Sequence, residues 1–171
     1  MKNVNGKIVH IYTDGGALGN PGPGGYGVVL LYRNKRKELS GGYRLTTNNR
    51  MEMKAVIEGL KTLKFPCDVI IYSDSKYVVD SINKGWIKTW RSRGWRRKGG
   101  EVKNIDLWKE INSLCEKHSV KFKWIKGHTG NPFNERCDYL AKNVAKSNNL
   151  PLDQYFEDKL NKLGDNGILI F

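Results

Sequence analysis

The first third of the chain carries the short hydrophobic period of β-strands. Apolar and β-branched residues form a run over 7–14 that ends at a glycine pair, which predicts a strand. After the glycine- and proline-rich turn at 19–25, the segments 26–33 and 37–45 predict two more strands joined by a hairpin. Three consecutive strands are therefore expected before any helix.

The hydrophobic period then lengthens to that of an amphipathic helix. Apolar side chains recur every three or four residues at Met53, Val56, Ile57, Leu60 and Leu63. Asn48 or Asn49 is expected to cap this helix, and Pro66 lies beyond its end.

The second half of the chain alternates between the two patterns. Further elements are predicted as a strand at 68–73, helices at 75–83 and 104–117, a strand at 120–125, and a last helix after the glycine-rich loop at 127–130. The order β-β-β-α-β-α-α-β-α predicts an α/β fold with a mixed five-stranded sheet flanked by helices. We expect one domain over 1–147 and a tail over 148–171, whose apolar end at 168–171 has no assigned role.

The net charge indicates an anionic partner. Lys and Arg number 30 against 17 Asp and Glu, which gives a formal charge of +13. A polyanion neutralises such self-repulsion, and the release of its counterions favours binding. Nucleic acid is the expected partner, although a basic protein without a polyanionic ligand would have the same composition. Much of the charge lies in the segment 84–103, which also holds three of the five tryptophans.

The cysteines and the chain ends indicate a reducing compartment. Cys67, Cys115 and Cys137 are odd in number and widely spaced, so we expect buried free thiols and no zinc site. The amino terminus lacks the apolar core of a signal peptide, and no apolar run approaches the length of a membrane span. A cytoplasmic protein is expected, a monomer without a membrane partner.

Four acidic residues stand near predicted strand ends and helix starts. Asp14 closes the first strand, Asp74 closes the fourth, Glu52 lies in the first turn of the first helix, and Asp138 begins the last helix. Because ligands of open α/β sheets collect at strand ends, these carboxylates could converge. Clustered carboxylates repel one another unless cations bind, and oxygen ligands favour Mg²⁺ or Mn²⁺. Two such ions would support phosphodiester hydrolysis.

Each candidate also has a purely structural interpretation. Asp14 can form a turn with the glycines after it, Glu52 can complement a helix dipole, and Asp74 can cap the next helix. Asp138 can be an ordinary first-turn acid. His128, in the glycine-rich loop, can move protons between a metal site and solvent, or it can be a solvated residue without a catalytic role.

Four segments change the balance between these interpretations. They are YTDGGALGNPGPGGYG at 12–27, TTNNRMEMKA at 46–55, YSDSKYVVDSI at 72–82 and KGHTGNPFNERCDYLA at 126–141. In order and with the family's intervals, they closely resemble type 1 ribonuclease H, in the form with a basic protrusion. The resemblance implies the ribonuclease H-like fold and an endonuclease that hydrolyses the RNA strand of RNA–DNA hybrids with two metal ions, leaving 5′-phosphate and 3′-hydroxyl ends.

The resemblance also implies roles for single residues. The metal-binding carboxylates would be Asp14, Glu52, Asp74 and Asp138, with His128 as the proton-shuttling residue. Thr47 and Asn49 would hold a phosphate of the DNA strand. Asn20 and Asn48 would approach the RNA strand and the minor groove, where 2′-hydroxyls distinguish RNA from DNA.

The segment 84–103 resembles the basic protrusion that holds the duplex; its alternative interpretation is a solvated charged loop with core tryptophans. The candidate contacts there are Trp86, Trp90, Arg91, Arg93 and Trp95. Two departures from the family pattern affect substrate binding. Lys76 stands where some members have a glutamine that reaches a base edge, so that contact is replaced by a phosphate contact or lost. Gly85 is a one-residue insertion that puts the contact of the next tryptophan in doubt.

Three other functions are compatible with parts of this pattern. A hybrid-binding module that does not cut would lack at least one metal acid, whereas all four are present. A DNA-cutting or strand-transferring enzyme on the same fold would need neither the TNNRME context nor the KGHTG segment. A phosphatase for small esters would not require the tryptophan-rich basic segment.

Overall fold

The order of the elements follows the order of hydrophobic periods along the chain. The computed structural model describes residues 8–166; position 7 of the first predicted strand and the apolar end at 168–171 lie outside the described residues. The strands are β1 (Ile8–Ala17), β2 (Gly22–Tyr32), β3 (Lys35–Thr46), β4 (Asp68–Ser73), β5 (Arg96–Arg97), β6 (Gly100–Glu101) and β7 (Ser119–Trp124). The helices are α1 (Asn48–Lys61), α2 (Lys76–Asn83), α3 (Trp86–Ser92), α4 (Ile105–Lys117), α5 (Pro132–Ala145) and α6 (Gln154–Asn166).

Five strands form the predicted mixed sheet, in the order β3-β2-β1-β4-β7. β1, β2 and β3 pair antiparallel through hairpins, whereas β1, β4 and β7 pair parallel because helices make the crossovers. In the β1–β4 pair Thr13 lies opposite Ser73. The residues that follow them, Asp14 and Asp74, are therefore brought to the same end of the sheet.

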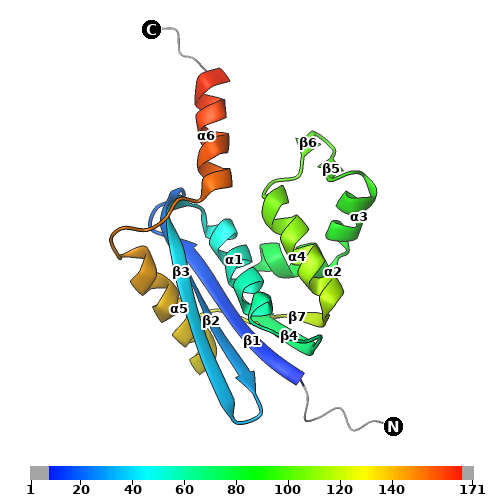
Figure 1. Ribbon diagram of the computed structural model, residues 1–171, viewed down its shortest axis with the longest axis vertical. Helices are drawn as coiled ribbons and strands as arrows, with labels where there is room; N and C mark the ends of the chain where they lie inside the picture. Colours follow the sequence, from blue (N-terminus) through cyan, green and yellow to red (C-terminus); the bar gives the residue numbers. More distant parts are fainter. Residues whose placement is uncertain (1–7, 167–171) are drawn as a thin grey trace.

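Helices cover both faces of the sheet (Figure 1). α5 packs on one face, against β1, β2 and β3, and α1 packs on the other, with α4 beyond it. The core on the α1 side contains the fully buried side chains of Ile11, Ile57, Ile71 and Trp108. α6 projects from the end of the molecule at which α1 begins (Figure 1).

The ends of two elements differ from the predictions because tertiary contacts override the local pattern. α1 is capped by Thr47, whose hydroxyl accepts a hydrogen bond from the backbone nitrogen of Arg50 at 3.2 Å, and not by an asparagine. β2 already begins at Gly22, inside the predicted turn. A Cβ at Gly25 would collide with the carbonyl oxygen of Ala141, so the glycines of this strand allow α5 to lie directly on the sheet.

The sequence patterns did not predict α3, the β5–β6 hairpin or α6. α3 has seven residues and buries only Ile87, so it leaves little hydrophobic period to detect. Cys137 is buried as expected, but Cys67 and Cys115 are only partly buried; all three thiols are free. Within residues 8–166, no helix combines the length and the apolar character that crossing a membrane would require.

Candidate active site

Three of the four predicted metal-binding acids meet at one end of the sheet. Carboxylate oxygens of Asp14, Glu52 and Asp74 all lie within 4.8 Å of one another. The parallel β1–β4 pair brings the two aspartates together, and α1 adds the glutamate. Asp14 lies inside β1, which continues to Ala17, and Glu52 lies in the second turn of α1 because the helix begins earlier than predicted.

A glycine next to Asp14 lets α1 approach β1 closely. A Cβ at Gly15 would lie 2.5 Å from the backbone nitrogen of Glu52 and would collide with the backbone of Met51. Any other residue at this position would push the helix away from the strand. The backbone nitrogen of Gly15 also donates to Oδ1 of Asp14 at 2.9 Å. Gly15 thus sets the spacing between the first two carboxylates.

Burial and mutual repulsion raise the pKa values of the three clustered acids. Burial and then the charge of Asp74 raise the pKa of Asp14 to about 7. Burial, with the charges of its two neighbours, raises the pKa of Glu52 well above its ordinary value. Oε2 of Glu52 is buried without a hydrogen-bond partner among the described residues. A buried carboxylate oxygen without a donor is what a bound cation would satisfy.

The fourth acid, Asp138, lies beside this cluster and not within it. Its Oδ2 accepts a hydrogen bond from Nζ of Lys142 at 2.8 Å, one turn further along α5. Asp138 and Asp14 line a common cavity of about 120 Å³, and the charge of Asp138 contributes to the raised pKa of Asp14. The expectation that Asp138 begins the last helix is wrong, because α5 starts at Pro132, after the cap formed by Asn131.

The loop before α5 surrounds Asp74. A Cβ at Gly127 would collide with Oδ2 of Asp74, so the glycine leaves room for the carboxylate. Burial raises the pKa of Asp74, while the side chains of Asn134 and His128 lower it. His128 is exposed, as a residue that exchanges protons with solvent must be.

Asn134 belongs to the site although sequence reasoning did not single it out. It is 3% exposed, and its amide nitrogen has no hydrogen-bond partner of good geometry among the described residues, yet it lies close enough to Asp74 to lower its pKa. The available signal was its position one helical turn before Asp138 in the 126–141 segment.

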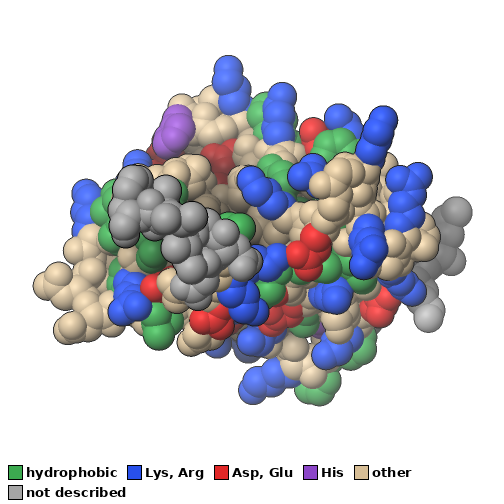
Figure 2. Space-filling model, turned by 90° about the horizontal axis from the view of Figure 1, so that it is seen from above, with side chains coloured by type: hydrophobic (Ala, Val, Ile, Leu, Met, Phe, Trp, Pro, Cys, Tyr) green, Lys and Arg blue, Asp and Glu red, His purple; other side chains and the backbone are tan. Residues whose placement is uncertain are grey.

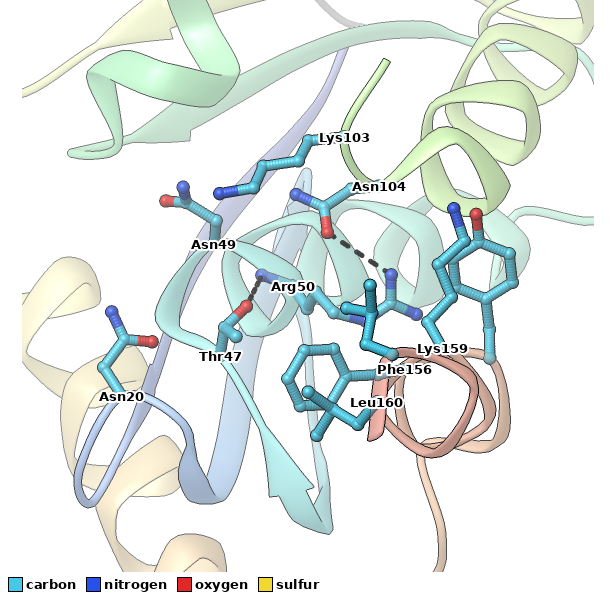
Figure 3. A pocket seen from close by; sticks show the side chains of 11 residues that line it. Asn20, Thr47, Asn49, Arg50, Lys103, Asn104, Phe156, Lys159 and Leu160 are labelled. Carbon is cyan, nitrogen blue, oxygen red and sulfur yellow. Dashed lines mark hydrogen bonds between the residues drawn. The ribbon is translucent and has the colours of Figure 1, made fainter. Parts of the chain in front are cut away.

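The residues predicted to contact the two strands of a hybrid lie around the first turn of α1. The Asn20 side-chain oxygen accepts from the backbone nitrogen of Asn48 at 3.1 Å, and the Asn48 side-chain oxygen accepts from the backbone nitrogen of Ala17 at 2.7 Å. Asn20, Thr47 and Asn49 line one side of a pocket of about 380 Å³ (Figure 3). Its other walls are Lys103 and Asn104, before α4, and α6.

Lys76, the first departure from the family pattern, lies near the acidic cluster. Its Nζ is 4.9 Å from the centre of the Trp124 ring, and the ring nitrogen of Trp124 donates to the backbone oxygen of Asp74 at 3.1 Å. The Lys76 side chain is exposed.

The segment 84–103 is an ordered unit around tryptophans. The Trp90 ring lies 6.1 Å from the core ring of Trp108 and 6.3 Å from that of Trp86, which is 39% exposed. Trp95 is half-buried, with Nζ of Lys109 6.0 Å from its ring centre. The structure therefore combines both interpretations: some tryptophans pack on the core while others remain accessible.

Basic side chains of the same unit point outward. Arg93 is exposed, whereas Arg91 forms an ion pair with Glu116 at 2.8 Å. Seen from above in Figure 2, Lys and Arg side chains stand around a hollow in which acidic side chains are visible. An anionic ligand would meet cations at the edges of this face before it reached the acids.

The chain has counterparts among known proteins. A family model described as RNase H matches residues 6–146. A ribonuclease H from Desulforamulus reducens is 60% identical over 153 residues, which cover 89% of this chain and 96% of that protein. One from Rippkaea orientalis is 56% identical over 158 residues, covering 92% and 97%.

Solved structures give the same result. LC9-RNase H1, a type 1 RNase H with the type 2 active-site motif, is 33% identical with a TM-score of 0.73, covering 81% of this chain and 72% of that one. LC11-RNase H1, solved in complex with an RNA/DNA hybrid, is 25% identical with a TM-score of 0.62, covering 86% and 99%.

Proposed function

This chain belongs to the ribonuclease H family, and from that premise we propose that it is an endonuclease that hydrolyses the RNA strand of RNA–DNA hybrids at its carboxylate cluster. The observation that carries the proposal is the convergence of Asp14, Glu52 and Asp74 in a protein of net charge +13. The positive surface attracts the duplex, and the acids stand where its scissile phosphate would be cut.

The family is metal-dependent, and the residues present fit a hard divalent cation. All three clustered ligands are carboxylates, their pKa values are raised, and one Glu52 oxygen has no donor in the part of the chain that the structure describes. Asp14, Glu52 and Asp74 would hold the metal, with Asp138 joining when Lys142 releases it. We assign Mg²⁺, two ions during catalysis, with Mn²⁺ as a substitute. When bound, such ions stabilise the charge that develops on the attacking and leaving oxygens of a phosphodiester.

The other residues of the site position the strand and move protons. His128 would carry a proton between the cluster and solvent and so help the product, with its 5′-phosphate and 3′-hydroxyl ends, to leave. Gly127 and Asn134 keep the Asp74 carboxylate in place. Both act through Asp74 and not on the substrate.

Recognition of the hybrid would use both sides of the cluster. Asn20 and Asn48 would read the ribose strand, because only that strand offers 2′-hydroxyls in the minor groove. Thr47 and Asn49 would hold the DNA strand at the pocket of Figure 3. Trp86, Trp90, Arg91, Arg93 and Trp95 would grip the duplex further out, with Lys76 near the scissile site.

We assign the catalytic domain to residues 1–147, with the protrusion at 84–103, and the segment 148–171 to a C-terminal addition. The family match ends at residue 146, which supports this boundary. We further propose a monomer in the cytoplasm. Free thiols at all three cysteines support the reducing compartment.

The test is cleavage of end-labelled RNA–DNA, RNA–RNA and DNA–DNA duplexes, with Mg²⁺ and then with chelator. We expect cutting of the RNA–DNA hybrid alone, and only with metal. Asp14→Asn should reduce turnover at least about a thousandfold while leaving hybrid affinity within a few-fold of wild type. Cleavage of DNA–DNA, cleavage in chelator, or normal turnover by the variant would each overturn the proposal. A hybrid-binding module would bind and leave every duplex intact.

A further inference from the structure

α6 is fixed beside the strand-binding pocket by a buried ion-pair network. Arg50, which is 3% exposed, donates from Nε to Oδ2 of Asp153 at 2.7 Å and from Nη2 to Oδ1 at 2.9 Å. Asp153, 5% exposed, also accepts from the Thr46 hydroxyl at 2.7 Å. Its Oδ1 accepts from the backbone nitrogen of Phe156 at 3.4 Å, and its carbonyl from that of Glu157 at 2.9 Å, so it caps α6. The helix therefore starts at a point fixed to the first turn of α1.

The side of α6 that lines the pocket carries an apolar stripe that residues 8–166 leave partly exposed. Phe156, Leu160 and Leu163 recur at helical spacing and all line it. Leu160 is 36% exposed and Leu163 is 67% exposed. In Figure 3, Phe156 and Leu160 lie across the pocket from Asn20. Exposed apolar patches often mark binding sites, and among the described residues this stripe stays partly exposed.

Cations and amides complete the lining of the same pocket. Lys103 forms no ion pair within residues 8–166, and Asn49 and Asn104 add polar side chains. Lys159 of α6 pairs with Glu101 at 2.6 Å, but both side chains are about half exposed, at 47% and 53%. An exposed ion pair contributes little free energy, so Lys159 can exchange Glu101 for another anion at small cost.

We propose that α6 is the outer wall of the duplex-binding groove, where Lys159 contacts a backbone phosphate while Leu160 and Leu163 pack against sugars of the strand held at Thr47 and Asn49. The inference rests on the proposed function. A nucleic-acid backbone alternates anionic phosphates with apolar sugar faces, and this pocket offers cations beside an apolar wall. A protein partner would match the leucines but would leave Lys103 and Asn49 without a role, whereas Asn104 already bonds to Arg50 and Tyr77.

The first test distinguishes a phosphate contact of Lys159 from a purely structural role of its ion pair with Glu101. Lys159→Ala removes the ion pair and the cation, whereas Glu101→Gln removes the same ion pair and keeps the cation. Hybrid affinity is measured in chelator by fluorescence anisotropy over a range of salt concentrations. We expect Lys159→Ala to bind about fivefold more weakly, with a salt slope lower by about one, and Glu101→Gln to bind as tightly as wild type or more tightly. Equal losses in both variants, or no loss in either, would overturn the inference.

The second test addresses the apolar stripe. Leu163 is so exposed that Leu163→Ser should leave the fold intact. We expect about threefold weaker hybrid binding with an unchanged salt slope, because an apolar contact releases no counterions. Lys162→Ala, on the same helix but outside the pocket lining, serves as the control and should lose less affinity than Lys159→Ala. Tighter binding by Leu163→Ser would show that the helix obstructs the groove and would overturn the inference.

These outcomes are distinct from a failure of the proposed function. If the wild-type protein does not cut the hybrid with Mg²⁺, the proposed function fails whatever α6 does. If it cuts normally while Lys159→Ala and Glu101→Gln bind alike, only the role of α6 fails.

Discussion

At the scale of single residues, the position of Asp14 in the carboxylate cluster opposes folding. Asp14 is 8% exposed and faces two other acids, so ionising it without a cation is unfavourable. Its pKa rises from an ordinary value of 3.8 to about 7. Between these values the folded protein keeps a proton that the unfolded chain has released. The free energy of unfolding of the metal-free protein must therefore fall as pH rises through this window.

Replacing this charge should stabilise the metal-free protein above pH 7. We expect Asp14→Asn to raise the free energy of unfolding by about 2 kcal/mol at pH 8 and by much less at pH 4, because the wild-type carboxyl is neutral there in the folded state. Urea unfolding in chelator at both values measures the difference. Mg²⁺ should stabilise the wild type more than the variant. A variant less stable than wild type at pH 8 would contradict this account.

Gly127 allows a second prediction at a single position. In Gly127→Ala the new methyl group would collide with Asp74 Oδ2, so the carboxylate must move or the loop must shift. We expect kcat to fall at least about tenfold with little change in hybrid affinity, because geometry at the reacting centre is what changes. Gly164→Ala, where a Cβ meets nothing within 4 Å, is the control and should keep normal turnover.

The residues of the candidate site could be predicted from the sequence only as alternatives to structural roles. Asp14 and Asp74 follow from strand ends, since the hydrophobic period locates those ends and parallel pairing aligns them. Glu52 was a candidate from its place near the start of a helix, but its distance from Asp14 depends on how closely α1 approaches β1, which no sequence pattern gives. Asn134 was missed because it comes close to Asp74 only through the tertiary packing of α5. No local sequence pattern predicts that contact.

At the scale of elements, one arginine joins three parts of the fold. Arg50 of α1 pairs with Asp106 at the start of α4 and with Asp153 before α6, both at 2.7 Å. Burial opposes the charge of Arg50, but hydrogen bonds to these two aspartates more than offset it and raise its pKa. The first turn of the catalytic helix is thereby tied to the C-terminal segment.

Breaking the buried ion pair between Arg50 and Asp153 should lower the free energy of unfolding much more than breaking an ion pair at the surface. Asp153→Ala uncaps α6 and leaves Arg50 with one acidic partner, so we expect a loss of about 3 kcal/mol in the free energy of unfolding. Glu157→Gln, which removes the pair with the 60% exposed Arg44, should cost less than about 1 kcal/mol. Urea unfolding of both variants provides the comparison, and equal losses would show that the network contributes no more than a surface contact.

Of the elements that sequence patterns missed, α6 is held by such long-range contacts. The five main strands and the helices α1, α2, α4 and α5 have clear hydrophobic periods and were predicted within a few residues. α6 carries its apolar stripe on an uncovered side and is fixed by residues 103 to 113 positions away in the sequence. Local periodicity contains no information about partners at that distance.

At the scale of the whole molecule, the charge of +13 governs how the enzyme meets its substrate. Cations surround the hollow face in Figure 2, so many phosphates of a duplex would be neutralised together. If six are neutralised, hybrid affinity should fall about a thousandfold between about 50 and about 200 mM salt. Titrations across that range measure the slope. A slope near zero would mean that the basic surface does not contact the duplex.

The Lys142–Asp138 ion pair makes the four acids unequal. Within residues 8–166, Asp14, Glu52 and Asp74 form no ion pair, so a cation that binds them relieves an electrostatic penalty that the metal-free protein carries. Asp138 is already paired with the ammonium group of Lys142, so a cation that binds Asp138 must displace that group. Replacing Asp138 with asparagine should accordingly reduce cleavage less than the corresponding replacement of Asp14, Glu52 or Asp74, so that the nuclease could work with three of its four predicted ligands.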